Sequence, residues 1–572
     1  MCELIDKLKI VKKSSNESID NDKIFTSFKR FMHVERCVQR DLESILQKTR
    51  SLKKALVLVC GNVGDGKSHL ISYLKNETHY LDDFFVHNDA TESYGRNQTE
   101  KQALAQVLSE FSDDNLNSGS VSKVIVAINL GILSNFLDSP EGSSFSKLRA
   151  YVTNCHVLVE GSFDTFGKES NTFFHVNFAD YHLYRLNNGS VDSPYIDQIL
   201  NKIFGDSPEN PFFKAYRDGC GKCPYSEKCP VKTNYECMCN DTFRKGLIRI
   251  LIETILKDKL IVSTRELLNF IYDITVHPAI VSDKYKGDFK IDYLLPNLLY
   301  DHSDLSELLF HVSKYDIVKA RWESLDIIIS CYVNALRPVE MYDRYISPNA
   351  CQSAVKKYLN ESGVQKAYGS ELKLFLRLLK LTPTSTFDNT ENEEYYDYIK
   401  YLYASARGDR STIKQLSQKV KSCIYIWNGS EDKKRIILRE IDDLYTLSTE
   451  LTINAGKAEL RSDCTETIFD KFSEKIPLKF SVNSGGIQKN EVFYIDYELY
   501  EMLVKIYNGF KVSSKEASYY AAFFSFVRHL ITYSNYKKEI TITSHENDKA
   551  RTFQIVDDSD DDEHYYRFEE VT

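Results

Sequence analysis

An apolar run followed directly by a glycine-rich loop constrains this chain more than any other feature. Residues 55–70 read ALVLVCGNVGDGKSHL, in which Gly61, four residues, Gly66, Lys67 and Ser68 follow one another. Glycine permits backbone conformations with positive φ, so successive N–H groups can turn toward an anionic phosphate. The residues after Ser68 suit a helix, whose N-terminal dipole would add to that field. The order strand, loop and helix therefore predicts a phosphate-binding loop rather than a simple glycine-rich turn.

The positions of this loop have distinct expected roles. Lys67 would reach the β- and γ-phosphates of a nucleoside triphosphate, and Ser68 would bind Mg²⁺. We expect ATP and Mg²⁺ as cofactors, with this nucleotide-contacting set: Gly61, Asn62, Val63, Gly64, Asp65, Gly66, Lys67, Ser68 and His69.

The length of 572 residues predicts several domains, because one ordinary core does not grow to that size. No apolar run approaches the ~20 residues needed to cross a bilayer, and the first residues lack the apolar core of a secretory signal. We therefore expect a cytoplasmic protein with no membrane partner, whose 13 cysteines are reduced or metal-bound. A net charge of −9 argues against a strongly basic, free-standing nucleic-acid binder. DNA contact through a local patch or a partner protein remains open.

Strand-like and helical segments alternate around the glycine-rich loop. The expected elements are a helix at 28–47, strands at 55–60, 84–88, 123–129 and 172–177, and helices at 67–76 and 99–111. Such alternation predicts a parallel sheet covered on both faces, with the nucleotide at the carboxyl ends of the strands.

The expected fold class is an α/β P-loop NTPase domain with an AAA- or STAND-like parallel sheet, followed by a large helical region and a small mixed α/β region. The expected domains are an N-terminal helical segment at 1–50, the NTPase core at 51–205, a cysteine-rich metal-binding insertion at 206–245, a helical lid and helical domain at 246–480, and a mixed α/β domain at 481–572.

Hydrolysis of ATP also needs an acidic residue near Mg²⁺ and a group that orients the attacking water. The strand at 123–129 ends in Asn129, whose amide oxygen can hold a Mg²⁺-bound water but cannot act as a base. Asp89 and Glu92, after the second strand, and Asp180, after the NFAD turn, are the candidate carboxylates. For each of them, a helix cap or a loop position is the alternative interpretation.

Two further side chains are candidates for sensing the bound phosphates. Asn177 ends the strand at 172–177 and could sense the γ-phosphate from there. Arg265, at the start of a helix in the sequence STRE, could close over the phosphates from a lid. A surface salt bridge is the alternative role of Arg265.

Five of the 13 cysteines lie in the segment GCGKCPYSEKCPVKTNYECMC. A Cys-x-x-Cys start lets two thiolates converge on one ion across a tight turn. Cys220, Cys223, Cys229 and Cys237 could hold a structural Zn²⁺, with Cys239 as a spare ligand. An iron–sulfur cluster suits four cysteines equally well, and free or redox-active thiols are the remaining interpretation. A bound metal would fix a small insertion that has too little core of its own.

Five segments in collinear order carry a resemblance to a known family. They are FKRFMHVERCVQRDLE at 28–43, LVLVCGNVGDGKSHLISYLK at 56–75, VHNDATES at 86–93, VIVAINLGILSNF at 124–136 and HVNFADYHLY at 175–184. In these segments the chain resembles the DptF family of phosphorothioation-dependent DNA restriction proteins, and the cysteine segment and STRELLNFIYD continue the likeness.

The resemblance implies a P-loop ATPase of a bacterial restriction system, acting with the companion proteins DptG and DptH on DNA that lacks the sulfur modification. By position, the ATP site would be the loop from Gly61 to Ser68. No nuclease-like constellation stands out, so we expect the chain to power or regulate cutting rather than perform it. A scaffold that binds nucleotide without turnover is the alternative, a small-molecule kinase is weaker, and a homo-oligomer remains open.

Overall fold

A computed structural model describes most of the chain. The described residues are 2–14, 27–88, 99–158, 171–281, 289–362, 369–385, 393–429, 434–442, 444–456, 464–535, 537–546, 549–557 and 566–571. The chain divides into two compact units. The first unit comprises Met1–Arg185, Val191–Glu391 and Asp470–Phe472, and the second comprises Leu186–Ser190, Asn392–Phe469 and Ser473–Thr572.

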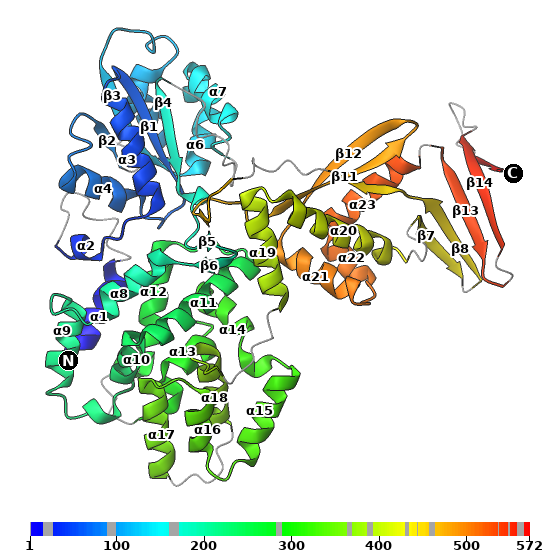
Figure 1. Ribbon diagram of the computed structural model, residues 1–572. Helices are drawn as coiled ribbons and strands as arrows, with labels where there is room; N and C mark the ends of the chain where they lie inside the picture. Colours follow the sequence, from blue (N-terminus) through cyan, green and yellow to red (C-terminus); the bar gives the residue numbers. More distant parts are fainter. Residues whose placement is uncertain are drawn as a thin grey trace. The chain divides into compact units, whose positions relative to one another are not determined.

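A four-stranded parallel sheet organises the first part of the first unit (Figure 1). Its strands are β1 (Lys54–Cys60), β2 (Phe85–His87), β3 (Ser122–Ile128) and β4 (Phe173–Asn177), in the order β2-β3-β1-β4. Every residue of β1 is buried, as expected for an apolar strand inside a parallel sheet. The predicted alternation of parallel strands and helices is confirmed.

Side chains of β1 alternate between two cores, one on each face of the sheet. Leu56 and Leu58 pack with the helices α5 (Glu100–Val107), α6 (Leu130–Leu137) and α7 (Ser146–Asn154). Val57 and Val59 pack with α3 (Cys37–Thr49) and α4 (Lys67–Glu77) on the other face. The period of two along a strand produces this division, and both faces of the sheet are therefore covered.

The helix expected at 28–47 is interrupted. Helix α2 (Ser27–Met32) ends before His33, and α3 begins after Arg36, whose backbone is extended with φ of −112°. At this break the Arg36 guanidinium donates to the carbonyl oxygens of Asp65 and Tyr181.

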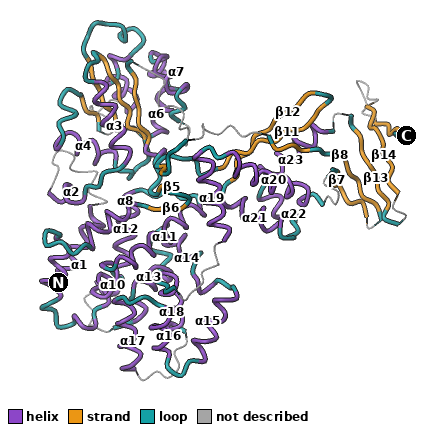
Figure 2. Tube along the Cα trace, in the orientation of Figure 1, coloured by secondary structure: helices purple, strands orange, loops and turns teal. Residues whose placement is uncertain are grey.

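The rest of the first unit is helical (Figure 2). Its helices are α1 (Glu3–Ser14), α8 (Pro194–Phe204), α9 (Pro211–Ala215), α10 (Pro230–Cys239), α11 (Asp241–Asp258), α12 (Thr264–Thr275), α13 (Leu295–Asp301), α14 (Glu307–Lys314), α15 (Glu323–Asn334), α16 (Pro338–Tyr345), α17 (Ala350–Ser362) and α18 (Ser370–Leu381). Helix α11 is central to this region, and Gly246 lets it approach the end of α18 closely. A Cβ at Gly246 would lie 1.9 Å from the Leu381 carbonyl oxygen.

The second unit combines helices with antiparallel sheets. Its helices are α19 (Glu393–Arg407), α20 (Arg410–Trp427), α21 (Tyr497–Tyr507), α22 (Ser514–Tyr519) and α23 (Ala521–Ser534). Strands β9 (Ile453–Ala455), β11 (Ile476–Ser484) and β12 (Ile487–Ile495) form one sheet, and β7 (Arg435–Asp442), β8 (Tyr445–Glu450), β13 (Glu539–Ser544), β14 (Lys549–Asp557) and β15 (Tyr566–Glu570) form another. The short strand β10 (Ile468–Phe469) pairs with β5 (Arg185–Asn187), which β6 (Ser190–Asp192) follows in the chain.

The expectation of helices as far as residue 480 is wrong beyond Trp427, because strands begin at Arg435. Strand β11 has the period of two that marks a half-buried strand, with Ile476, Leu478 and Phe480 buried between more exposed or polar residues. Strands β13 and β14, within the region expected to be mixed α/β, are antiparallel neighbours. Within the described residues, no helix is both long and apolar enough to cross a membrane.

Candidate functional site

The glycine-rich loop leaves the carboxyl end of β1 and runs into the N-terminus of α4. Gly61, Gly64 and Gly66 have φ of 153°, 89° and 98°. Gly66 is the N-cap of α4 in the left-handed region, where a β-carbon is strained. Lys67 and Ser68 form the first turn of that helix, so the backbone has both features expected of an anion-binding turn.

Lys67 folds back over the loop that precedes it. Its ammonium donates hydrogen bonds to the carbonyl oxygens of Gly61 (3.0 Å) and Asn62 (2.6 Å). The Asp65 carboxylate accepts the Asn62 N–H at 2.5 Å and thereby closes the turn, whereas Val63 is 74% exposed at its tip. Burial raises the pKa of Asp65 above its usual value, against the opposing effects of the Asn62 N–H and the Lys67 charge.

Two asparagines lie at the same edge of the sheet as the loop. Cys60 pairs in register with Ile128 on one side and Asn177 on the other, so Asn129 and Asn177 both end strands next to β1. The Asn129 side chain accepts the Gly131 N–H at 2.8 Å as the N-cap of α6. Asn177 accepts the Ala179 N–H at 3.1 Å.

Of the three candidate carboxylates, Asp180 lies within the described residues, and Asp89 and Glu92 do not. Asp180 lies near the start of the loop, because both its charge and that of Lys67 affect the pKa of Cys60, the residue before Gly61. Burial is the main cause that raises the pKa of the Cys60 thiol to about 12; Lys67 lowers it and Asp180 adds to it. Asp89 and Glu92 lie outside the described residues, beyond the end of β2 at His87.

Helix α12 presents its N-terminus to the loop. A Cβ at Gly64 would lie 3.2 Å from Ser263 Oγ and 3.5 Å from Arg265 Cβ. Ser263 and Glu266 cap α12 reciprocally, since Ser263 accepts the Glu266 N–H and the Glu266 carboxylate accepts the Ser263 N–H. The structure thus brings Arg265, predicted to act from a lid, beside the loop.

Arg36 is a loop-contacting residue to which the sequence analysis assigned no role. Its guanidinium donates to the Asp65 carbonyl oxygen at 3.1 Å and to the Tyr181 carbonyl oxygen at 3.4 Å. It also lies over the rings of Phe178 and Tyr195, with its Cζ 5.2 and 5.0 Å from the ring centroids. The only signal for it in the sequence is its place in HVERCVQRDLE, a segment that carries the resemblance.

His69, expected to contact nucleotide, packs among aromatic rings. Its Nε2 lies 3.1 Å from Nδ1 of His33, and His33 stacks on Tyr73 with 3.6 Å between ring centroids. The pKa of His69 is lowered to about 4, mainly by burial and additionally by the charges of His33 and Lys29. The His69 imidazole is therefore neutral at pH 7 and adds no positive charge for phosphate binding.

The cysteine segment differs from its predicted ligand set at Cys237. Cys237 forms a disulfide with Cys351 of α17 and is therefore not available as a metal ligand. The prediction of Cys237 as a ligand is wrong. The expectation that all cysteines are reduced or metal-bound is wrong for this pair. Among the residues described, no group of three or more His, Cys, Asp or Glu side chains is already arranged to hold a metal ion.

Neither a scan against protein-family models nor searches of curated proteins and solved structures found a match to this chain. The likeness to the DptF family therefore remains a hypothesis that rests on the sequence segments that carry it.

Proposed function

We propose that the chain binds Mg²⁺-ATP through the loop from Gly61 to Ser68 and hydrolyses it. We propose further that it is the ATPase subunit of a bacterial phosphorothioation-dependent restriction system, acting with DptG and DptH on DNA that lacks the sulfur modification. The observation that supports nucleotide binding best is the loop itself: three positive-φ glycines lead from the buried strand β1 to the N-terminus of α4. The DNA target and the partners come from the resemblance alone.

The contacts of Lys67 suggest how the site would accept a triphosphate. Its ammonium now bonds two carbonyl oxygens of the loop, and phosphate oxygens would replace them with charge-assisted hydrogen bonds. The Ser68 hydroxyl would bind Mg²⁺, while the N–H groups of the loop and the α4 dipole would stabilise the negative charge. Arg265, beside Gly64, would add positive charge from α12.

Hydrolysis requires a carboxylate as well. Asp180 is the candidate on the described part of the chain, because its charge affects the pKa of Cys60, the residue before the loop. Asp89 and Glu92 remain candidates from the sequence. Asn177 would contribute polarity at the edge of the sheet rather than proton transfer, since an amide is not a base at neutral pH.

A scaffold that binds nucleotide without useful turnover is the second candidate function, and Asn129 favours it. This residue ends the strand next to β1, where a carboxylate would assist hydrolysis, and its amide oxygen already accepts the Gly131 N–H. In that case the bound nucleotide would stabilise the first unit while partners dock elsewhere.

The decisive experiment compares ATP binding and phosphate release by the wild type, Lys67→Ala and Lys75→Ala. Lys75 is exposed in the last turn of the same helix and is the matched control. Loss of one charge-assisted contact of about 1.5–3 kcal/mol predicts at least about tenfold weaker binding by Lys67→Ala, and no change for Lys75→Ala.

Each protein is assayed alone, with unmodified or phosphorothioated duplex DNA, and with DptG and DptH. Turnover that requires Lys67 and rises with unmodified DNA or with the partners supports the ATPase proposal. Binding without turnover under every condition supports the scaffold. Absence of nucleotide binding by the wild type would falsify both.

A further inference from the structure

Three cysteines of the cysteine-rich segment lie around a compact turn in the first unit. Cys220 ends the helical turn Tyr216–Cys220, and the Cys223 N–H donates to the Cys220 carbonyl oxygen at 3.2 Å. The next turn follows at once, since the Ser226 N–H donates to the Cys223 carbonyl oxygen at 3.1 Å. Cys229 is then the N-cap of α10. This geometry presents the first two thiols from one tight turn and the third from a helix start.

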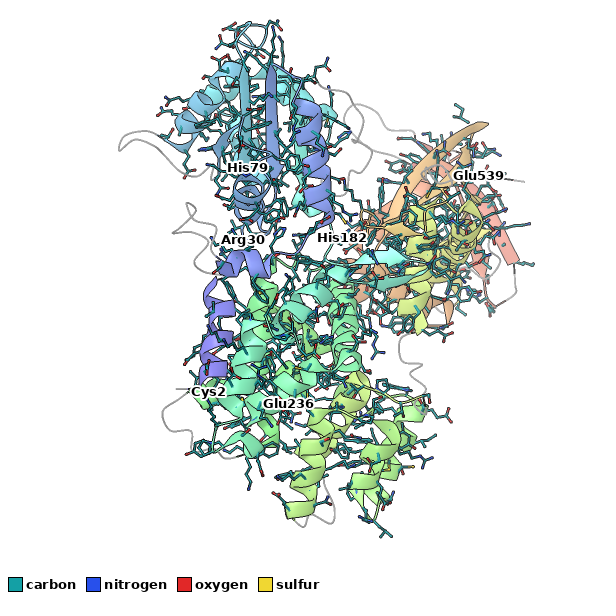
Figure 3. All side chains as sticks on the ribbon, turned by 60° about the vertical axis from the view of Figure 1, so that its left-hand side comes forward. Cys2, Arg30, His79, His182, Glu236 and Glu539 are labelled. Atoms are coloured by element: carbon teal, nitrogen blue, oxygen red, sulfur yellow. A yellow bond between two sulfur atoms is a disulfide. The ribbon has the colours of Figure 1, made fainter. Side chains whose placement is uncertain are left out.

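The beginning of α1 packs directly against this turn. A Cβ at Gly219, next to Cys220, would lie 3.3 Å from Glu3 Cβ. Cys2 immediately precedes Glu3, and its carbonyl oxygen accepts the Asp6 N–H at 3.0 Å, so the first turn of α1 fixes its backbone. Figure 3 labels Cys2 at this end of α1, within the helical part of the first unit. The start of α1, with Cys2, therefore lies beside the cysteine turn although it comes from a distant part of the sequence.

We propose that these residues form a tetrathiolate metal centre, which takes a zinc ion or an iron–sulfur cluster. Its four ligands are Cys2, Cys220, Cys223 and Cys229. All four lie outside the disulfide. Four thiolates are a complete ligand set for a structural zinc ion and for an iron–sulfur cluster, and this set replaces the one predicted from the sequence.

The electrostatics of the cluster support the proximity of the four thiols. Cys220 is buried, and Cys2, Cys229 and Cys223 all lie close enough to interact with it electrostatically. In the proposed centre the four sulfurs would bind as thiolates, and the metal cation would offset the repulsion between them. The thiols are not yet arranged as ligands, so binding would complete the site by rotating their side chains.

Cys229 is placed at the start of a helix, as the N-cap of α10. The first backbone N–H groups of that helix therefore lie on the side of the Cys229 residue. Such N–H groups at a helix start stabilise a thiolate ligand.

The other two cysteines of the segment, Cys237 and Cys239, have surroundings that differ from those of the proposed ligands. Cys237 is paired with Cys351. The pKa of Cys239 is raised to about 12 by burial, and the charges that act on it are those of Arg244, Glu236 and Asp206. Cys239 is therefore a matched control, since it lies in the same segment without belonging to the proposed centre.

The test measures zinc and iron in the full-length chain, purified without oxygen and then offered Zn²⁺. Visible absorption separates an iron–sulfur cluster from zinc. The proposal predicts about one metal centre per chain in the wild type and in Cys239→Ser. Cys2→Ser and Cys223→Ser should bind the metal at least about tenfold more weakly. Loss of a residue that only supports a ligand changes metal affinity by about 10- to 100-fold, and loss of a ligand itself should cost at least as much.

A zinc-binding histidine distinguishes loss of a ligand from misfolding. If the wild type holds zinc, Cys2→His should restore binding that Cys2→Ser loses, since imidazole is a ligand for zinc in Cys₃His sites. With Co²⁺ as the probe, the thiolate-to-cobalt absorption should fall in Cys2→His, while the metal content stays. The assignment is overturned if the wild type takes up neither metal, if Cys2→Ser retains full metal content, or if Cys239→Ser loses it equally.

Discussion

At Gly64 the loop combines a left-handed backbone with contact to another helix. Its φ is 89°, and a Cβ there would lie 3.2 Å from Ser263 Oγ. An alanine in the left-handed region costs roughly 1–2 kcal/mol, and the contact leaves it little room to relax. We therefore expect Gly64→Ala to lower the stability of the first unit by about this amount and to weaken nucleotide binding. Urea denaturation and a nucleotide titration measure the two effects.

Gly486 supplies the matched control for backbone strain. It has φ of 87° in the turn between β11 and β12 of the second unit, and a Cβ there would meet nothing within 4 Å. Gly486→Ala should cost a similar backbone strain but leave nucleotide affinity unchanged. Wild-type affinity in Gly64→Ala would show that the conformation of the loop does not matter for binding.

Single residues differ in how well the sequence predicts their role. The glycines and Lys67 are predictable because their task depends on the local backbone, and a fixed spacing expresses it. Arg36 contacts the Asp65 carbonyl oxygen, and Glu3, next to Cys2, lies beside Gly219 of the cysteine turn; no local pattern in the sequence marks these pairings. Such pairings are visible only in the folded chain.

At the scale of elements, the capping box of α12 connects helix stability to the loop. Ser263 accepts the Glu266 N–H at 3.2 Å and also faces Gly64. Loss of a serine N-cap costs about 1 kcal/mol, and fraying of this turn would displace Arg265. We expect Ser263→Ala to lower the stability of the first unit by about that amount and to weaken ATP binding severalfold. Thermal unfolding and nucleotide titration check both effects.

A second capping box provides the control for this prediction. Ser513 and Glu516 cap α22 in the second unit with the same reciprocal pattern. Ser513→Ala removes an equivalent cap far from the loop in sequence, so its ATP affinity should equal that of the wild type. Equal weakening of ATP binding in the two variants would refute a specific role for the α12 cap.

The elements of the parallel sheet are well predicted because β1 and β3 are continuous apolar runs bounded by turns, and burial on both faces requires such runs. The strands of the second unit were missed where polar residues alternate with apolar ones, as in β11. The period of two is present in β11, but the helical segments earlier in the chain favour a prediction of continued helix. The break before α3 coincides with tertiary contacts of Arg36, and the hydrophobic periodicity of the sequence does not predict such contacts.

At the scale of the whole molecule, the two units each contain one of the two tryptophans. Trp322 is the N-cap of α15 in the first unit, and its Nε1 donates to Ser324 Oγ at 2.8 Å. Trp427 ends α20 in the second unit and packs against Phe523, with 5.2 Å between ring centroids. Trp322→Phe and Trp427→Phe therefore leave one fluorescent reporter in each unit.

These reporters test whether nucleotide acts on the unit that contains the loop. A ligand at 100 times its Kd stabilises the folded state that binds it by about 2.7 kcal/mol. In the Trp427→Phe protein, Mg²⁺-ATP should raise the unfolding temperature reported by Trp322, and adding Lys67→Ala should abolish the increase. In the Trp322→Phe protein, Trp427 should report no comparable change. An equal, Lys67-dependent shift at both tryptophans would mean that the units unfold together, whereas no shift at Trp322 would contradict nucleotide binding at the loop.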